Sequence, residues 1–166
     1  LKLENRNMSE QKAYFAAGCF WGVEDRFRKT PGVLDAVSGY MGGHVDNPGY
    51  KQVCTGETGH AEAVEVTFDN EKVRYEELLE LFFSMHNPTT LNRQGPDFGS
   101  QYRSAIFFVD GEQRAAAEAA IGAVDASGRW NDPVVTQVAE AETFWRAEEY
   151  HQRYFEKNGA GFCQVH

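Results

Sequence analysis

The sequence predicts an α+β fold: a single-domain α/β sandwich with a mixed sheet, a ferredoxin-like β-α-β-β-α-β core, extra helices and a flexible C-terminal tail. Three observations favour this fold class. The chain has 166 residues, enough for one domain with a sizeable core. Its strand-like and helix-like segments follow one another in the order of a split β-α-β sandwich. It contains no internal repeat, low-complexity tract or Pro/Ser-rich linker that would divide it.

The first three elements follow from apolar spacing and turn residues. Residues 12–17 form a short apolar segment that predicts a buried strand. Residues 20–29 carry apolar side chains three and four positions apart, which predicts a helix ended by Pro31-Gly32. The β-prone residues 33–40 predict a second strand, which stops before Gly42-Gly43.

The middle of the chain contains two long loops. Residues 43–60 are polar and glycine-rich and predict the first loop. Residues 61–68 alternate between polar and apolar and predict a half-buried strand, and the strongly apolar residues 75–86 predict a helix. The second loop is expected over residues 87–103, before a strand over 104–109. Long, glycine-rich loops in a small domain usually carry function.

The last third of the chain predicts three further elements. The alanine-rich residues 112–126 predict a helix that Gly128 ends. Residues 133–138 predict the last strand, and residues 147–157 predict the last helix.

These elements divide the chain into three parts. Residues 1–11 are an N-terminal extension, of which residues 1–7 precede Met8 and are either natural or appended. Residues 12–158 form the folded domain. Residues 159–166 begin with a glycine-rich stretch and form the flexible tail.

The charge balance excludes several classes of protein. With 16 Lys and Arg against 25 Asp and Glu, the net charge is −9, whereas nucleic-acid and anionic-membrane partners require a basic surface. No apolar stretch reaches the roughly 18 residues of a transmembrane helix. Residues 1–12 lack the apolar segment of a signal peptide, so we expect a cytoplasmic protein whose three cysteines are thiols.

The most informative segment is Gly18-Cys19-Phe20-Trp21-Gly22, where the first strand is expected to turn into the first helix. A cysteine at a helix N-terminus faces unpaired backbone N–H groups and the positive end of the helix dipole. Both stabilise a thiolate and lower the pKa of the thiol. Cys19 is therefore a candidate nucleophile. A buried structural cysteine beside two core aromatic residues explains the same position equally well.

The other two cysteines differ from Cys19 in their surroundings. Cys54 lies in the first long loop, without a helix dipole, and is interpreted as a structural residue. Cys163 follows Gly159 and Gly161 near the C-terminus, where little can pack against it. A mobile tail thiol suits a resolving cysteine, which must reach a distant sulfenic acid or mixed disulfide. An incidental terminal cysteine is the alternative.

Neither a metal site nor a cofactor site is predicted. The five histidines form no i,i+4 pair, and no C-x-x-C motif occurs. His60, His86 and His151 are expected to make structural hydrogen bonds. No phosphate-binding or dinucleotide fingerprint occurs, so we expect no metal and no organic cofactor.

Four blocks of the sequence together resemble the peptide methionine sulfoxide reductase A family. In chain order they are GCFWG at 18–22, GYMGG and PGYKQVCTGETGHAE within 39–62, PTTLNRQG and QYRS within 88–104, and YHQ at 150–152. The blocks keep the family's order and extend over nearly the whole chain.

This resemblance implies a thiol-dependent reduction of methionine S-sulfoxide, in proteins or as the single amino acid, and hence repair of oxidised proteins under oxidative stress. Cys19 would attack the sulfoxide sulfur and become a sulfenic acid, which Cys163 would convert into a Cys19–Cys163 disulfide. Thioredoxin would reduce that disulfide. Residues 12–158 would then be a catalytic domain, which we expect to act as a monomer.

The resemblance also assigns the remaining site residues. It makes Glu62 the proton donor and gives the hydroxyls of Tyr50 and Tyr102 to binding of the sulfoxide oxygen. A carboxyl group in an apolar, aromatic pocket has a raised pKa and stays protonated. Without the resemblance, all three would be interpreted as surface or packing residues. The expected substrate-binding residues are Phe20 and Trp21, which would form an apolar pocket for the methyl group, and Asp97, in a supporting, water-mediated role.

Two functions of other classes stay open. A thiol hydrolase or acyltransferase would need a histidine within hydrogen-bond reach of Cys19 and would not need Cys163. A noncatalytic module would use its aromatic residues to bind a methylated ligand and would show no thiol-dependent turnover.

Overall fold

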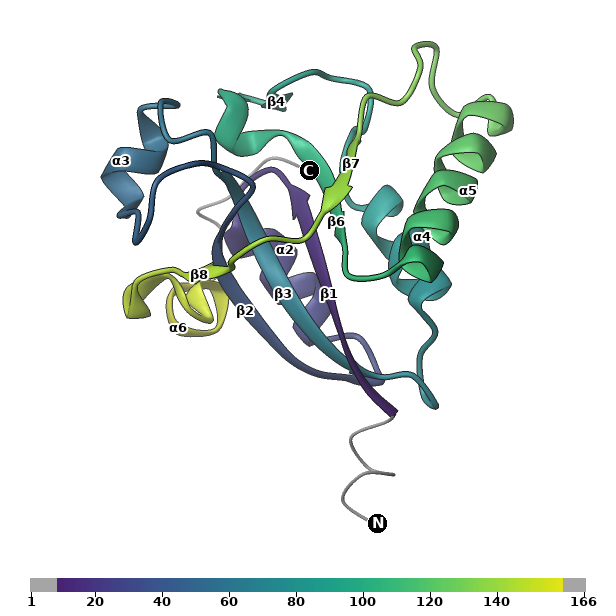
Figure 1. Ribbon diagram of the computed structural model, residues 1–166, viewed down its shortest axis with the longest axis horizontal. Coiled ribbons are helices and arrows are strands. Elements are labelled where there is room, and N and C mark those ends of the chain that lie inside the picture. Colours follow the sequence, from purple (N-terminus) through teal and green to yellow (C-terminus); the bar gives the residue numbers. More distant parts are fainter. Residues whose placement is uncertain (1–8, 160–166) are drawn as a thin grey trace.

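A six-stranded sheet runs through the centre of the protein (Figure 1). The computed structural model describes residues 9–159. Across the sheet the strands follow the order β7-β6-β1-β3-β2-β8. β6 and β7 are parallel and all other neighbours are antiparallel, which confirms the predicted mixed sheet. The strand bounds are β1 Glu10–Ala17, β2 Val33–Met41, β3 Ala61–Asp69, β6 Ser104–Phe108, β7 Gln137–Glu140 and β8 Trp145–Arg146.

Helices lie near both edges of this sheet. Helix α5 packs against β6, β7 and α4, and α4 also contacts β1, whereas α3 and α6 lie at the opposite edge, near β2 and β8 (Figure 1). Helix α2 packs against β2 and β3. The architecture is thus the single α+β domain that the sequence predicts. The helix bounds are α2 Phe20–Arg28, α3 Tyr50–Cys54, α4 Tyr75–Ser84, α5 Gly111–Ser127 and α6 Tyr154–Asn158.

Aromatic side chains from the sheet and two helices form the centre of the core. The ring of Phe15 on β1 lies 4.9 Å from that of Phe27 on α2 and 5.3 Å from that of Phe82 on α4. All three side chains are fully buried. Burying each one contributes about 1.5–3 kcal/mol, so this cluster fixes α2 and α4 on the sheet.

The predicted helix over 112–126 is present as α5, and its ends have clear local causes. The Asp110 side chain accepts a hydrogen bond of 2.8 Å from Gln113 N, which caps the first turn. Gly128 follows the last turn in the left-handed conformation, with φ of 75°. Both signals are local in sequence, which is why this helix could be predicted.

Both predicted long loops contain short elements. The first loop includes α3, whose five residues are too few for a periodic pattern. The second loop includes a small hairpin of β4, Arg93–Gln94, and β5, Asp97–Phe98, followed by the 3₁₀ turn η1, Ser100–Tyr102. These pieces place residues of both loops beside the sheet.

The predicted helix over 147–157 is wrong. That stretch contains the 3₁₀ turn η2, Glu149–His151, and the short helix α6, separated at Arg153, whose φ is +53°. The buried side chain of Gln152 accepts a hydrogen bond from Ser38 N and donates one to Ser38 O, each of 2.9 Å. These distant contacts replace the local helix. The strand predicted over 133–138 lies at 137–140 instead, as β7, because its pairing with β6 sets its bounds, and it is not the last strand because β8 follows it.

Candidate active site

Cys19 lies at the N-terminus of helix α2, as the sequence predicts. It is the N-cap residue of the helix, and its side chain is partly exposed. The preceding Gly18 has φ of +91°, and a Cβ there would lie 2.9 Å from Gln94 Cγ. Only glycine meets both constraints without strain, so Gly18 allows the sharp turn that presents Cys19.

Glu62 reaches the same helix terminus from strand β3. Its side chain is 1% exposed, and its Oε1 accepts a hydrogen bond of 3.2 Å from Phe20 N. Phe20 directly follows Cys19, so this bond brings a buried carboxyl group to the turn that carries the thiol. A helix N-terminus favours such a partner because its first backbone N–H groups lack acceptors within the helix.

Tyr50 and Tyr102 come from the two loops and meet near Glu62. Tyr50 begins α3 and Tyr102 ends η1, and both side chains are half-buried. Burial raises the pKa of each hydroxyl, and the neighbouring Glu62 carboxyl group adds to this rise. Both tyrosines are therefore protonated at neutral pH and can donate a hydrogen bond. Cys19 also contributes to raising the pKa of Tyr102, which brings the thiol into the same group.

The three expected substrate-binding residues differ in how they relate to this group. Phe20 is buried, with its ring 6.4 Å from that of Tyr50, so it belongs both to the core and to the site. Trp21 is half-buried beside it. Asp97 on β5 adds to the raised pKa of Tyr102, and its supporting role stays a prediction.

His151 also contacts the residues of this site, although the sequence analysis predicts only a structural hydrogen bond for it. It is fully buried, and its ring lies 5.1 Å from Phe20 and 4.4 Å from Tyr50. Its Nδ1 accepts a hydrogen bond of 2.9 Å from Trp21 Nε1. Because an indole N–H can only donate, His151 is neutral here and carries its proton on Nε2. Burial lowers the pKa of His151 and so favours this neutral form.

Glu148 is a second residue that the sequence analysis does not identify. Its Oε1 accepts a hydrogen bond from the Tyr40 hydroxyl and its Oε2 accepts one from Tyr50 N, both at 2.8 Å. Burial alone would raise the pKa of this carboxyl, but these hydrogen bonds bring it below its ordinary value. The ionised Glu148 thus fixes the start of α3. Its partners lie about a hundred positions earlier, so no local signal identifies it.

The other two cysteines have different outcomes. Cys54 is exposed at the end of α3, and its interpretation as a structural residue stays a prediction. It forms a hydrogen bond with the Tyr50 hydroxyl, and burial of part of its surface raises the pKa of the thiol. The C-terminal end of a helix does not stabilise a thiolate, which agrees with that direction. Cys163 lies outside the described residues.

Two further histidines, His60 and His86, form hydrogen bonds within the fold. His60 Nδ1 accepts a hydrogen bond of 3.0 Å from Gly43 N, and its Nε2 lies 2.7 Å from Val45 O. The ring nitrogens of His86 lie 2.7 Å from Phe82 O and from Ser104 Oγ, and burial lowers the pKa of His86 to about 4. Residues 9–159 contain no group of three or more His, Cys, Asp or Glu that could hold a metal ion. Within the same part of the chain, no helix is long and apolar enough to cross a membrane.

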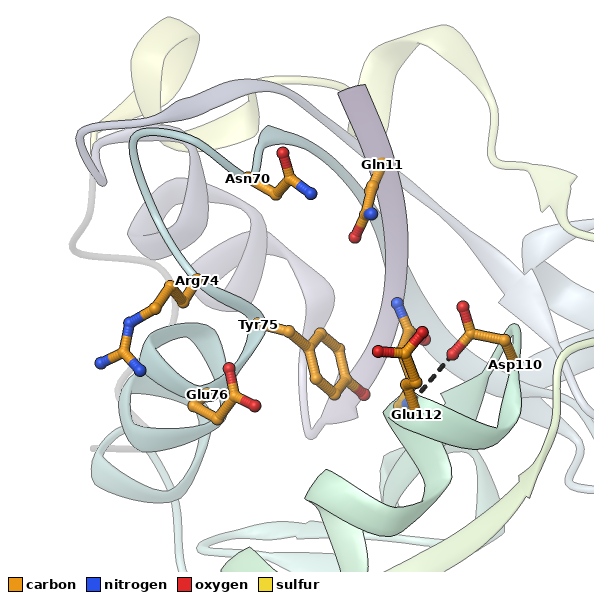
Figure 2. Close-up of a pocket in the computed structure, with 8 residues that line it drawn as sticks. Gln11, Asn70, Arg74, Tyr75, Glu76, Asp110 and Glu112 are labelled. Atoms are coloured by element: carbon orange, nitrogen blue, oxygen red, sulfur yellow. Dashed lines mark hydrogen bonds between the residues drawn. The ribbon is translucent and has the colours of Figure 1, made fainter. Parts of the chain in front are cut away.

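A polar cleft of about 220 Å³ lies at the other end of β1 (Figure 2). It is formed by the start of β1, the turn after β3 and the N-termini of α4 and α5. It includes none of the site residues predicted from the sequence and no cysteine. Its lining residues are Gln11, Asn70, Arg74, Tyr75, Glu76, Asp110, Glu112 and Gln113.

Comparisons with known proteins agree on one family. The family model described as peptide methionine sulfoxide reductase matches residues 11–166. The chain is 57% identical over 154 residues to the peptide methionine sulfoxide reductase MsrA of Acidobacterium capsulatum, with 93% of this chain and 99% of that protein covered.

Solved structures give the same result. Reduced Mxr1 from Saccharomyces cerevisiae is 34% identical, with a TM-score of 0.87 over 94% of this chain and 90% of that one. The structure of Mxr1 in complex with Trx2 also shares the fold, at 23% identity and a TM-score of 0.64, over 89% of this chain and 86% of that one.

Proposed function

The chain belongs to the peptide methionine sulfoxide reductase family, and we propose that it reduces methionine sulfoxide with Cys19 as nucleophile and Glu62 as proton donor. Family membership makes it a thiol-dependent peptide-methionine (S)-S-oxide reductase. The hydrogen bond from Phe20 N to Glu62 Oε1 carries the residue assignment, because it links a buried carboxyl group to the turn that presents the thiol.

The first step transfers the sulfoxide oxygen to Cys19. The thiolate attacks the sulfoxide sulfur while Glu62 protonates the oxygen, with the Tyr50 and Tyr102 hydroxyls donating hydrogen bonds to it. The protonated oxygen then passes to the Cys19 sulfur as the bonds from the substrate sulfur to oxygen and to Cys19 break, which gives a Cys19 sulfenic acid and methionine. Sulfur is reduced by two electrons in the substrate and oxidised by two electrons in Cys19.

Aromatic residues would bind the methyl group of the substrate. Phe20 and Trp21 offer apolar faces, which suit a methyl group that carries partial positive charge. Asp97 takes a supporting, water-mediated role near Tyr102. The same pocket would accept an oxidised methionine in a protein or as the single amino acid, so the activity would repair oxidised proteins.

The second step would use the tail. The Cys163 thiol attacks the sulfenic sulfur of Cys19, water leaves, and a Cys19–Cys163 disulfide forms. Cys163 lies four positions after Gly159, which limits this span to about 14 Å. Gly159 follows the last residue of α6, and α6 packs against α2, the helix that begins beside Cys19. A thioredoxin-type dithiol then reduces the disulfide, a step supported by the complex of the related Mxr1 with Trx2.

We further propose that the four strands β6-β1-β3-β2 are the ferredoxin-like core expected from the sequence. Every neighbouring pair among them is antiparallel. Helix α2 connects β1 to β2, and helix α4 lies between β3 and β6 in the chain, which is the β-α-β-β-α-β order of that core. The proposed nucleophile follows the end of the central strand β1, and the proposed proton donor lies near the start of its neighbour β3.

Mass spectrometry without any reductant tests this function. Wild-type protein treated with methionine sulfoxide should lose two protons in mass as the disulfide forms. Cys163→Ser should instead release about one methionine per protein, stall as a Cys19 sulfenic acid that dimedone traps, and lose most thioredoxin-driven turnover. An acyl adduct on Cys19 would indicate a hydrolase, and an unchanged mass would indicate a binding module. If Cys163→Ser kept its thioredoxin-driven turnover, Cys163 would not be the resolving cysteine, and Cys54 would be the next candidate.

A further inference from the structure

The backbone of Arg153 is held in a conformation that arginine rarely adopts. Its φ is +53°, and the only other described non-glycine residues with positive φ are Asn47 and Asn92. Asparagine tolerates the left-handed region, whereas a long side chain adopts it only where the surrounding contacts impose it. The Arg153 side chain is exposed, with Glu156 at 4.0 Å as its ion-pair partner. The contact that imposes the turn therefore involves the Arg153 backbone.

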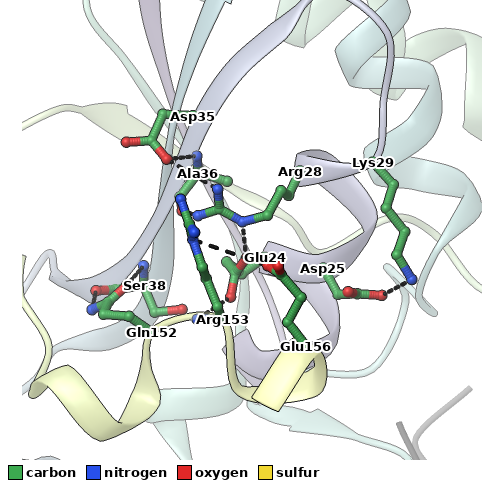
Figure 3. A network of polar contacts seen from close by, with 10 residues as sticks. All are labelled: Glu24, Asp25, Arg28, Lys29, Asp35, Ala36, Ser38, Gln152, Arg153 and Glu156. Carbon is green, nitrogen blue, oxygen red and sulfur yellow. Dashed lines mark hydrogen bonds and ion pairs between the residues drawn. The ribbon is translucent and has the colours of Figure 1, made fainter. Parts of the chain in front are cut away.

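Glu24 on helix α2 supplies that contact (Figure 3). Its side chain is almost fully buried, and its Oε1 accepts a hydrogen bond of 2.9 Å from Arg153 N. Its Oε2 accepts a second bond, of 2.6 Å, from Arg28 Nε one helical turn later. Arg28 is held in turn by Ala36 O and by Asp35 at 3.2 Å. Because Arg28 holds the buried Glu24 carboxylate in place, this carboxylate is a strong acceptor for the Arg153 amide.

The residues on either side of this turn hold Trp21. Just before it, His151 accepts the Trp21 indole hydrogen bond. Just after it, the ring of Tyr154 stacks on that of Trp21, with 3.7 Å between centroids and 6° between planes. The turn at Arg153 thus brings two groups to Trp21, one to its ring edge and one to its face. If the turn opened, both contacts would lose their geometry.

We infer that Glu24 is a positioning residue: by holding the left-handed turn at Arg153, it fixes Trp21 as one wall of the pocket for the substrate methyl group. The assignment of that pocket rests on the proposed function, but the chain of contacts from Glu24 to Trp21 does not. Glu24 lies on the same helix as Cys19, so it fastens the distant C-terminal segment to the element that carries the thiol.

Four variants separate this role from a general loss of stability. Glu24→Ala removes both contacts of the carboxylate. Arg28→Met removes the ion pair but leaves the Arg153 amide its acceptor, and the methionine keeps most of the apolar stem. Glu24→Ala/Arg153→Gly adds a residue for which the left-handed turn is not strained. Asp25→Ala is the matched control, because it removes a neighbouring carboxylate whose partner is the exposed Lys29.

The first measurement is the methionine released in a single turnover, as a function of sulfoxide concentration. Glu24→Ala should raise the concentration for half-maximal rate roughly tenfold, the order expected for a lost charge-assisted hydrogen bond. Its rate at saturation should change far less. Arg28→Met and Asp25→Ala should bind sulfoxide within about twofold of wild type, and the double variant should regain most of the affinity.

The second measurement needs no turnover. The Trp21 indole N–H resonance, assigned with Trp21→Phe, should move in Glu24→Ala, stay in place in Arg28→Met and Asp25→Ala, and return in the double variant. Equal effects of Glu24→Ala and Arg28→Met on this resonance would overturn the inference, and so would a double variant without recovery. If Glu24→Ala does not fold, the inference requires the double variant to fold with a wild-type resonance, and its failure to do so overturns it. A wild-type protein without turnover would instead contradict the proposed function and leave the resonance test valid.

Discussion

Carboxyl groups and tyrosines lie at both ends of strand β1, but only one end also has a thiol that they could assist. At the end near Cys19, a carboxyl group and two tyrosines meet a partly exposed thiol. At the other end, the cleft of Figure 2 brings Tyr75 together with Asp110 and Glu112. Burial and nearby carboxylates raise the pKa of Tyr75, as they do for Tyr50 and Tyr102. A tyrosine with a raised pKa therefore does not by itself identify a reactive site.

The carboxyl groups explain the difference between the ends. Glu62 is buried beside the turn that presents the thiol. Asp110 caps helix α5, and Glu112 and Glu76 are exposed in the first turns of their helices, where carboxylates stabilise the helix dipole. The cleft also contains no cysteine. Only the end at Cys19 combines a nucleophile with a shielded acid, and this contrast leads to three predictions.

The largest effect should come from the thiol itself. Cys19→Ser should abolish reductase activity, a loss on the order of 10⁴-fold or more, because a serine hydroxyl cannot form a sulfenic acid. Cys54→Ser should stay near wild type, since that exposed thiol lies at the wrong end of its helix. Methionine release in a reductant-free assay measures both variants. Substantial turnover by Cys19→Ser would show that Cys19 is not the nucleophile, and the contrast between the two ends of β1 would then fail.

A smaller effect is expected at the acid. Glu62→Gln should slow the reductase step by about 10²–10⁴-fold, because glutamine can still accept the Phe20 hydrogen bond but cannot readily transfer a proton. Rapid mixing with methionine sulfoxide, followed by quantification of methionine, gives the rate. The melting temperature serves as the control for folding. A rate within twofold of wild type would make Glu62 a purely structural residue.

The smallest effect is expected in the cleft. The Tyr75 hydroxyl is buried and has no hydrogen-bond partner among the described residues. Tyr75→Phe should leave the rate of methionine release within about twofold of wild type. The free energy of unfolding should stay the same or rise by up to about 1 kcal/mol, because a buried hydroxyl without a partner is removed. A large loss of activity would show that the two ends of β1 are coupled, and denaturant unfolding would show whether stability is the cause.

The sequence predicts the elements whose signals are local. The helix over 112–126 has a capping aspartate at one end and Gly128 at the other, and it occurs as α5. The turn at Gly18-Cys19 follows from a glycine between a strand-like and a helix-like segment, and it occurs as predicted. In both cases the residues that decide the conformation lie within a few positions of one another.

The sequence does not predict the C-terminal segment correctly. Residues 147–157 have the composition of a helix, but Gln152 binds Ser38, His151 binds Trp21, and Arg153 N binds Glu24. These partners lie more than a hundred positions earlier in the chain. Hydrogen bonds and burial at that separation outweigh local helix propensity, which amounts to only a few tenths of a kcal/mol per residue.

The sequence by itself determined the family, the α+β class, the position of Cys19 and the set of residues proposed for the chemistry, because these depend on motifs and short-range spacing. Only the tertiary structure decided how those residues meet: Glu62 on the Phe20 amide, Tyr50 fixed by Glu148, and Trp21 held between His151 and Tyr154. The reason is physical. Hydrogen bonds and ring contacts act over a few ångströms in space, and the chain brings distant positions within that range only when the sheet and its helices have packed.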